Sequence, residues 1–195
     1  MKNIKKSTLL IASTLLICTF GILGSASWLA IDTPPIQNNF TAASVKPGIS
    51  EEFNGEVKKN VYVQNNGSVN VYIRAAIELT WIDSDNNMYS VPPQPEHYEM
   101  DLNLRSDTNT ESNWIQAADG YYYYLVDVEP NGITQNLINE CSLKEDVDGP
   151  VGYNFCVDVI AQTIQADPDR AVEESWTNSK IDIDANAGEL TITAK

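Results

Sequence analysis

The sequence of 195 residues predicts an all-β domain built from antiparallel strands. The first observation is the stretch from Glu56 to Trp81, in which apolar and polar side chains alternate. Side chains repeat every second residue in a strand, so this pattern indicates strands with one buried face. The second is a series of turn dipeptides, such as Asn66-Gly67 and Asp119-Gly120, between runs rich in valine, isoleucine and tyrosine. The third is that only residues 168–176 have the pattern of a helix.

The organising element is the long alternating run that ends at Trp81. Its apolar face consists of Val69, Val71, Ile73, Ala75, Ile77, Leu79 and Trp81. A shorter run with Val61 and Val63 precedes it, and residues 65–68 separate the two. Three connections fit this pattern. A three-residue turn with Gly67 in the left-handed conformation keeps the valines of both runs on one face, whereas the tighter Asn66-Gly67 turn reverses them. The third connection is an arch that crosses to a second sheet.

Residues 1–27 have the composition of a secretory signal peptide. A basic start is followed by an apolar run from Leu9 to Leu23 and by three small residues at 25–27. The apolar run is short for a membrane span, so we expect cleavage between Ser27 and Trp28, or one residue earlier. The alternative is an uncleaved anchor, because Trp28 extends the apolar character. After cleavage the protein is expected to be exported and free of the membrane.

Residues 28–45 follow the signal and are predicted to be extended. Prolines 34 and 35 exclude a helix, and the stretch from Asn38 to Val45 is strand-like. The side chains with which this segment could fill pockets on a sheet are Trp28, Leu29, Ile31, Phe40, Ala42 and Val45. We expect the segment to act as a donor strand that adds to the sheet of a neighbouring subunit. The alternative is that it packs only on its own domain. Residues 46–55 are predicted to be a polar connector.

Further strands and one helix are predicted beyond Trp81. Residues 83–113 are rich in turns around one short strand at 98–102, and further strands are expected in two parts of 114–128, at 137–143 and at 153–164. The helix is predicted to begin with Asp167 as N-cap and Pro168 in its first turn, and to end near Trp176. The β-domain therefore spans residues 46–176. The tail, residues 177–195, has two short alternating runs around Asn186-Ala187-Gly188 and is predicted to be a hairpin.

The charge of the chain disfavours two classes of partner. Acidic residues number 27 against 12 basic ones, which gives a formal charge of −15. Three of the basic residues lie in the signal, so cleavage leaves 27 against 9, or −18. A surface of this charge repels nucleic acid and anionic membranes. It also keeps the protein soluble, and it makes contacts between subunits dependent on salt.

The sequence assigns no catalytic, metal-binding or cofactor-binding residue. Zinc peptidases usually present two histidines one helical turn apart, and this chain has the single histidine His97 in a proline-rich stretch. Nothing resembles the nucleophile elbow of a serine hydrolase. Residues 83–87 begin like a calcium loop, but Met88 stands where glycine is needed and Gln94 where a bidentate glutamate is needed. We therefore expect an acidic turn there and a protein that is not an enzyme.

Two cysteines remain after the signal is removed. Cys18 leaves with the signal, and Cys141 and Cys156 stay in the exported chain. A hairpin centred on Asp148-Gly149 would place these two cysteines opposite each other, where a disulfide could close the loop. The alternative is two reduced thiols, because the redox state of the compartment decides between them.

Several strings occur in the order of a known family. They are NNFTAASV after the signal, KKNVYVQNNGSVNVYIRA, NWIQAADGYYYY with EPNGIT behind it, and VDVIAQTIQAD before the helix. In this order, behind a signal peptide, they resemble the TasA and camelysin family of Gram-positive biofilm-matrix proteins, most of all its clostridial BsaA-type members. The resemblance covers residues 39–176. The family often has glycine where Ala43 or Ser44 stands here, and the tail after Trp176 is not part of its pattern.

The resemblance implies a jelly-roll-like antiparallel β-sandwich, export through a dedicated signal peptidase, and assembly into extracellular fibres. In relatives the segment after the signal can complete a neighbour's sheet, and here that segment is residues 28–45. We therefore expect a secreted, pilin-like subunit of the biofilm matrix or cell surface. Its partner would be a second copy of itself, with accessory matrix or anchoring proteins as further candidates. The rival functions are a monomeric surface adhesin and, since camelysins have been classed so, a metallopeptidase.

Overall fold

The structure is a computed structural model that describes residues 44–53 and 57–195. The signal, its cleavage site at Ser27–Trp28 and the donor residues from Trp28 to Ala42 lie outside the described residues. Along the chain the elements are β1 (Pro47–Phe53), β2 (Val57–Asn65), β3 (Val71–Ile82), β4 (Tyr98–Leu102), β5 (Trp114–Gln116), β6 (Tyr122–Val128), β7 (Ile138–Leu143), β8 (Asn154–Gln165), α2 (Arg170–Trp176), β9 (Ile181–Asn186) and β10 (Glu189–Ala194).

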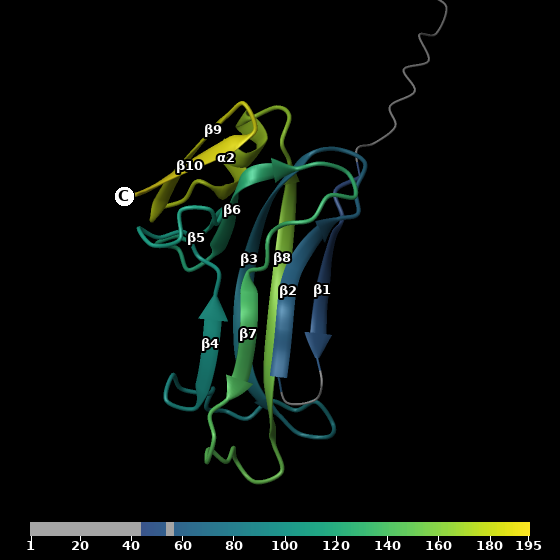
Figure 1. Cartoon of the computed structure of the whole chain (residues 1–195). Coiled ribbons are helices and arrows are strands. Elements are labelled where there is room, and N and C mark those ends of the chain that lie inside the picture. Colours follow the sequence, from purple (N-terminus) through teal and green to yellow (C-terminus); the bar gives the residue numbers. More distant parts are fainter. Residues whose placement is uncertain (1–43, 54–56) are drawn as a thin grey trace, which may run out of the picture. The chain divides into compact units, whose positions relative to one another are not determined.

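Two antiparallel sheets pack together, which confirms the predicted β-sandwich with one short helix (Figure 1). One sheet has the order β1-β2-β7-β4 and the other has the order β8-β3-β6-β10-β9, with β5 paired to β6. The strands β2 and β3 lie in different sheets, so the connection between them is the arch. Between β2 and β8 the chain changes sheet at every connection except β5 to β6, as expected of a jelly-roll-like sandwich.

The main core lies between the two sheets. Val61 and Val63 of β2 face Val71, Ile73 and Ala75 of β3, and all five are fully buried. The long strand β3 thus buries the face that its alternation predicts. The other large members of this core are Trp114, Tyr124, Leu137 and Ile138.

A second core lies on the outer face of the six-stranded sheet. The hairpin β9–β10 joins this sheet through the pair Glu189↔Val126 with β6, and the apolar side chains of the hairpin and of the helix α2 meet Tyr72 of β3 and Tyr123 of β6. Those side chains are Val172, Trp176, Ile181, Ile183, Ala185 and Leu190. The tail therefore contains the predicted hairpin and has a packing role, because it helps to bury Tyr72 on the outer face of β3.

Two local predictions are wrong. Residues 47–53 were expected in a connector, but they form β1, which pairs with β2 from Pro47↔Asn65 to Phe53↔Lys58. None of these residues is fully buried, so backbone pairing rather than an apolar pattern makes this stretch a strand. The helix begins later than predicted. The bond between Asp167 and Pro168 is cis, and α2 starts at Arg170 with Asp169 as N-cap.

The predicted cysteine hairpin is also wrong. Cys141 lies on β7 and Cys156 on β8, and these strands belong to different sheets. The register argument required them to be neighbours in one hairpin, whereas the chain arches between the sheets instead. Both cysteines are free thiols in the structure.

Candidate strand-docking site

The strand β8 has one free edge. It pairs with β3 along its whole length, from Asn154 to Gln165, and no strand in the described part of the chain pairs with its other side. The Ala166 N–H donates to the Asn70 carbonyl at 2.9 Å, in register with this ladder. In an antiparallel strand the backbone N–H and C=O groups of successive residues point alternately toward the strand on one side and toward the other side. Val157, nine residues from Ala166, therefore directs its N–H and C=O away from β3, toward the free edge.

The inner face of β1 lies next to this edge and is largely uncovered. Ile49 pairs with Val63, whose side chain is in the core, so Ile49 and Phe53 point toward the opposite sheet. Yet Ile49 is 40% exposed and Phe53 is 59% exposed. The reason is that β1 is the edge of its own sheet, and the strand of the other sheet that it contacts is the edge strand β8.

A bulge in β2 points a lysine into this region. Between the pairs Ser50↔Tyr62 and Glu52↔Lys59 the register shifts by one residue, and Asn60 has a φ of 53°. An extra residue reverses the alternation that follows it, so Lys58 lies on the same face as Val61 and Val63. Its side chain is buried, with only 8% of the residue exposed.

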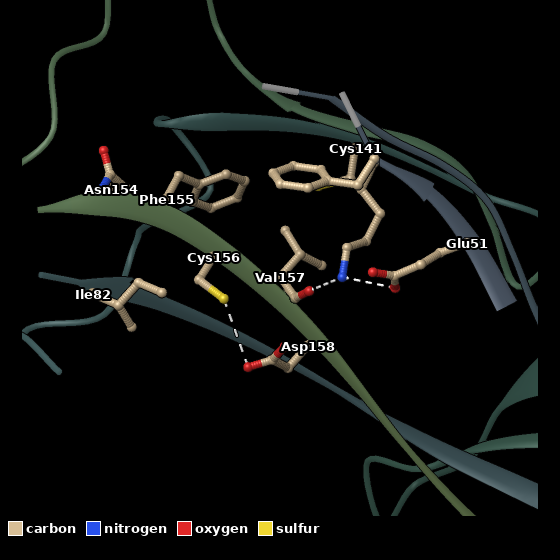
Figure 2. A pocket seen from close by; sticks show the side chains of 10 residues that line it. Glu51, Ile82, Cys141, Asn154, Phe155, Cys156, Val157 and Asp158 are labelled. Carbon is tan, nitrogen blue, oxygen red and sulfur yellow. Dashed lines mark hydrogen bonds and ion pairs between the residues drawn. The ribbon is translucent and has the colours of Figure 1, made fainter. Parts of the chain in front are cut away.

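The ammonium group of Lys58 closes the region between β1 and β8. It donates a hydrogen bond to the Val157 carbonyl and forms an ion pair with Glu51 of β1 at 2.9 Å. Figure 2 shows Glu51 and Val157 joined by dashed lines through this nitrogen. The Lys58 side chain thus spans from β2 to an outward-facing carbonyl on the free edge of β8.

A cavity of about 360 Å³ adjoins this lysine. Its apolar wall includes Phe53, Ile82 and Phe155, and both cysteines also line it. Burial raises the pKa of the Cys141 thiol to about 11, although the nearby Lys58 opposes this effect. Burial and the Asp158 carboxylate raise the pKa of Cys156 as well. Neither thiol is therefore set up as a nucleophilic thiolate, and the cavity suits an apolar side chain better than a covalent reaction.

His97 and Asp83, which were considered above for a catalytic site and a calcium loop, have structural hydrogen-bond partners. The His97 Nδ1 accepts a hydrogen bond from the Gln94 N–H at 2.9 Å, and the ring lies 6.0 Å from that of Trp81. The Asp83 carboxylate accepts hydrogen bonds from the Asp85 and Asn87 N–H groups and from the Asn87 side chain. These bonds lower the pKa of Asp83. No group of three or more metal-ligating side chains is close enough to hold an ion in residues 44–53 and 57–195.

The sequence-predicted residues stand apart from this site. Of the donor residues only Val45 is described, and it lies exposed just before β1. Lys58 and Glu51 were not predicted as site residues, because the alternation around Val61 places Lys58 on the outer face. The one signal for the bulge is Asn60, since asparagine tolerates the left-handed conformation better than most residues. Within the described ranges no helix is both long and apolar enough to cross a membrane.

Comparisons with protein-family models, with curated proteins and with solved structures found no match to this chain.

Proposed function

We propose that this protein is a secreted structural subunit that polymerises into extracellular fibres by donating a strand to the next copy. The observation that supports this most is the free edge of β8 beside the uncovered inner face of β1. A strand added to β8 would extend the six-stranded sheet opposite β1. Its inward side chains would then cover Ile49 and Phe53, which the domain itself leaves exposed.

The donor is the segment 28–45 of a second copy. Its strand-like part is residues 38–45. Because Ser44 is bonded within its own domain, the part that would dock is residues 38–43, six residues that would reach about 20 Å at roughly 3.4 Å per residue. The β8 edge has 12 residues, so the donor fits within it. Backbone hydrogen bonds to the outward-facing groups of β8 would supply affinity, and Phe40 and Ala42 would meet the apolar face of β1. Donation from one copy to the next does not close on itself, so the product is a filament.

Deletion of residues 28–43 from the chain that begins at Trp28 tests this function. The deletion stops before Ser44, because the Ser44 carbonyl accepts a hydrogen bond from the Ser68 N–H at 2.8 Å and belongs to the fold. We expect the intact chain to form filaments in electron micrographs, and the deleted chain to be folded and monomeric. A synthetic peptide of residues 28–45 should bind the deleted chain. Normal filaments from a folded deletion variant would refute strand donation.

A further inference from the structure

Lys58 is a charged residue on the inner face of a β-sandwich, which requires an explanation. Burying an ammonium group costs free energy unless it finds partners, and an apolar residue here would pack against Cys141 and Val157 without that cost. One of the two partners that Lys58 finds is on β1, the edge strand beside β2, and the other is in the opposite sheet. They are the Val157 carbonyl on the free edge of β8 and Glu51 on the edge strand β1.

We infer that Lys58 guards the acceptor edge, so that an incoming strand has to displace its ammonium group before it can pair with β8. This inference rests on the proposed function and specifies how its docking site is controlled. In a sheet each outward carbonyl accepts from an N–H of the next strand. The Lys58 ammonium occupies that position at Val157, and the ion pair with Glu51 holds it there. A strand that docks past Val157 cannot leave both contacts in place.

Inward-pointing charges and edge lysines are known means of preventing edge-to-edge pairing. Lys58 combines the two, because its stem points inward and its head reaches an edge carbonyl. The contacts of Lys58 also link β1 to β8, so in the monomer they hold the two edge strands together. Hydrogen bonds to charged groups are stronger than neutral ones, so displacing the Lys58 ammonium costs free energy. The many backbone hydrogen bonds that a docking strand forms can offset that cost.

The neighbouring Lys59 provides a matched control. It lies on the opposite face of β2, where 45% of its side chain is exposed, and it pairs with Glu140 of β7 at 3.0 Å. Lys58 and Lys59 therefore have the same chemistry, the same strand and one acidic partner each. Only Lys58 contacts β8.

The test compares assembly of the chain that begins at Trp28 in three forms: wild type, K58M and K59M. Methionine keeps most of the length of the lysine stem and removes the charge and the donor. We expect K58M to assemble roughly tenfold faster by light scattering, the factor that corresponds to about 1.4 kcal/mol. K59M should assemble like wild type. Circular dichroism checks the fold of each variant, and the double variant K58M/E51Q, which leaves no unpaired carboxylate, replaces K58M if that chain does not fold.

The outcomes separate the guard from the function on which it rests. Wild-type protein that assembles through residues 28–43 at the same rate as K58M, or faster, overturns the guard alone. Equal acceleration in K58M and K59M also overturns it, because a general loss of positive charge then explains the effect. Wild-type protein that never assembles, or that assembles normally without residues 28–43, overturns the proposed function itself.

Discussion

Two buried tyrosines in the second core should respond in opposite ways to the loss of their hydroxyl groups. Tyr72 of β3 and Tyr123 of β6 are both 0% exposed, and they pack against α2 and the terminal hairpin. The Tyr123 hydroxyl donates to Asp119 at 2.9 Å and accepts from Arg74 at 3.2 Å. The Tyr72 hydroxyl has no hydrogen-bond partner in the described structure. We predict that Tyr72→Phe stabilises the protein and Tyr123→Phe destabilises it.

The magnitudes follow from the partners of each hydroxyl. A buried hydroxyl without a hydrogen bond costs about 1–3 kcal/mol, and replacing tyrosine by phenylalanine removes that cost while the ring stays in place. Tyr72→Phe should therefore raise the free energy of unfolding by about 1–2 kcal/mol. Tyr123→Phe leaves a carboxylate and a guanidinium each without one partner, so it should lower the free energy of unfolding by about 1–3 kcal/mol.

Urea unfolding at pH 7, followed by tryptophan fluorescence, measures both changes. In a chain of this size a change of 1 kcal/mol shifts the midpoint of thermal unfolding by roughly 2–4 °C, which gives an independent check. The slope of free energy against urea should be the same in all three proteins, because no variant changes the surface exposed on unfolding. Equal losses of stability in the two variants would refute the reasoning, since they would mean that the Tyr72 hydroxyl has a partner.

Four further predictions follow from the site and its surroundings. Burial raises the pKa of Tyr72 and of Tyr123 to about 12 from 10.0, and that of Cys141 to about 11 from 9.0, so these groups should lower the free energy of unfolding as the pH rises from about 9 to 12, as urea melts across that range would show. The unreduced, denatured chain without its signal should present two titratable thiols, and in the native protein Cys156 should react before Cys141, which is only 1% exposed. Trp176→Ala should destabilise the protein by about 3–5 kcal/mol in a thermal melt, because it removes a buried ring whose centroid lies 5.8 Å from that of Tyr123 and leaves a cavity. Filament growth should accelerate from 0.01 to 0.15 M salt, over which the screening length falls from about 30 to about 8 Å, and a flat rate would exclude repulsion as the limit.

The buried face of β3 could be predicted from the sequence, because it depends only on the alternation of side chains along one strand. Whether a hairpin or an arch connects β2 to β3 could not be predicted, because residues distant in the sequence decide it. The Asn65 side chain is fully buried in the arch, where its amide donates to the Val69 carbonyl at 2.8 Å and to the Val128 carbonyl at 2.9 Å. Val128 lies 63 residues away in the chain, so no turn rule applied to residues 65–68 can include it.

The same limit explains the errors at the cysteines and at the candidate site. Placing Cys141 opposite Cys156 assumed that consecutive strands pair, whereas a sandwich of this type sends consecutive strands to different sheets. At the site, strict alternation puts Lys58 on the solvent face, and one additional residue in β2 turns it inward. The residues of the proposed docking site are therefore placed by the bulge in β2 and by the free edge of β8, and neither feature has a strong pattern in a single sequence.

The net charge of the chain and the ammonium group of Lys58 act over different distances, and this difference gives the proposed guard at the β8 edge its purpose. In the proposed exported form, a charge of −18 would keep subunits apart, but at physiological salt its effect decays over about 8 Å. Two strands in a sheet lie about 4.8 Å apart, so repulsion between whole subunits is weak protection once an edge is within contact range. The ammonium of Lys58 acts at that range, on a single carbonyl of β8. An apolar residue in its place would pack well but would leave the edge open to any extended chain. A lysine held by Glu51 instead admits only a strand that forms enough new hydrogen bonds and apolar contacts to displace it.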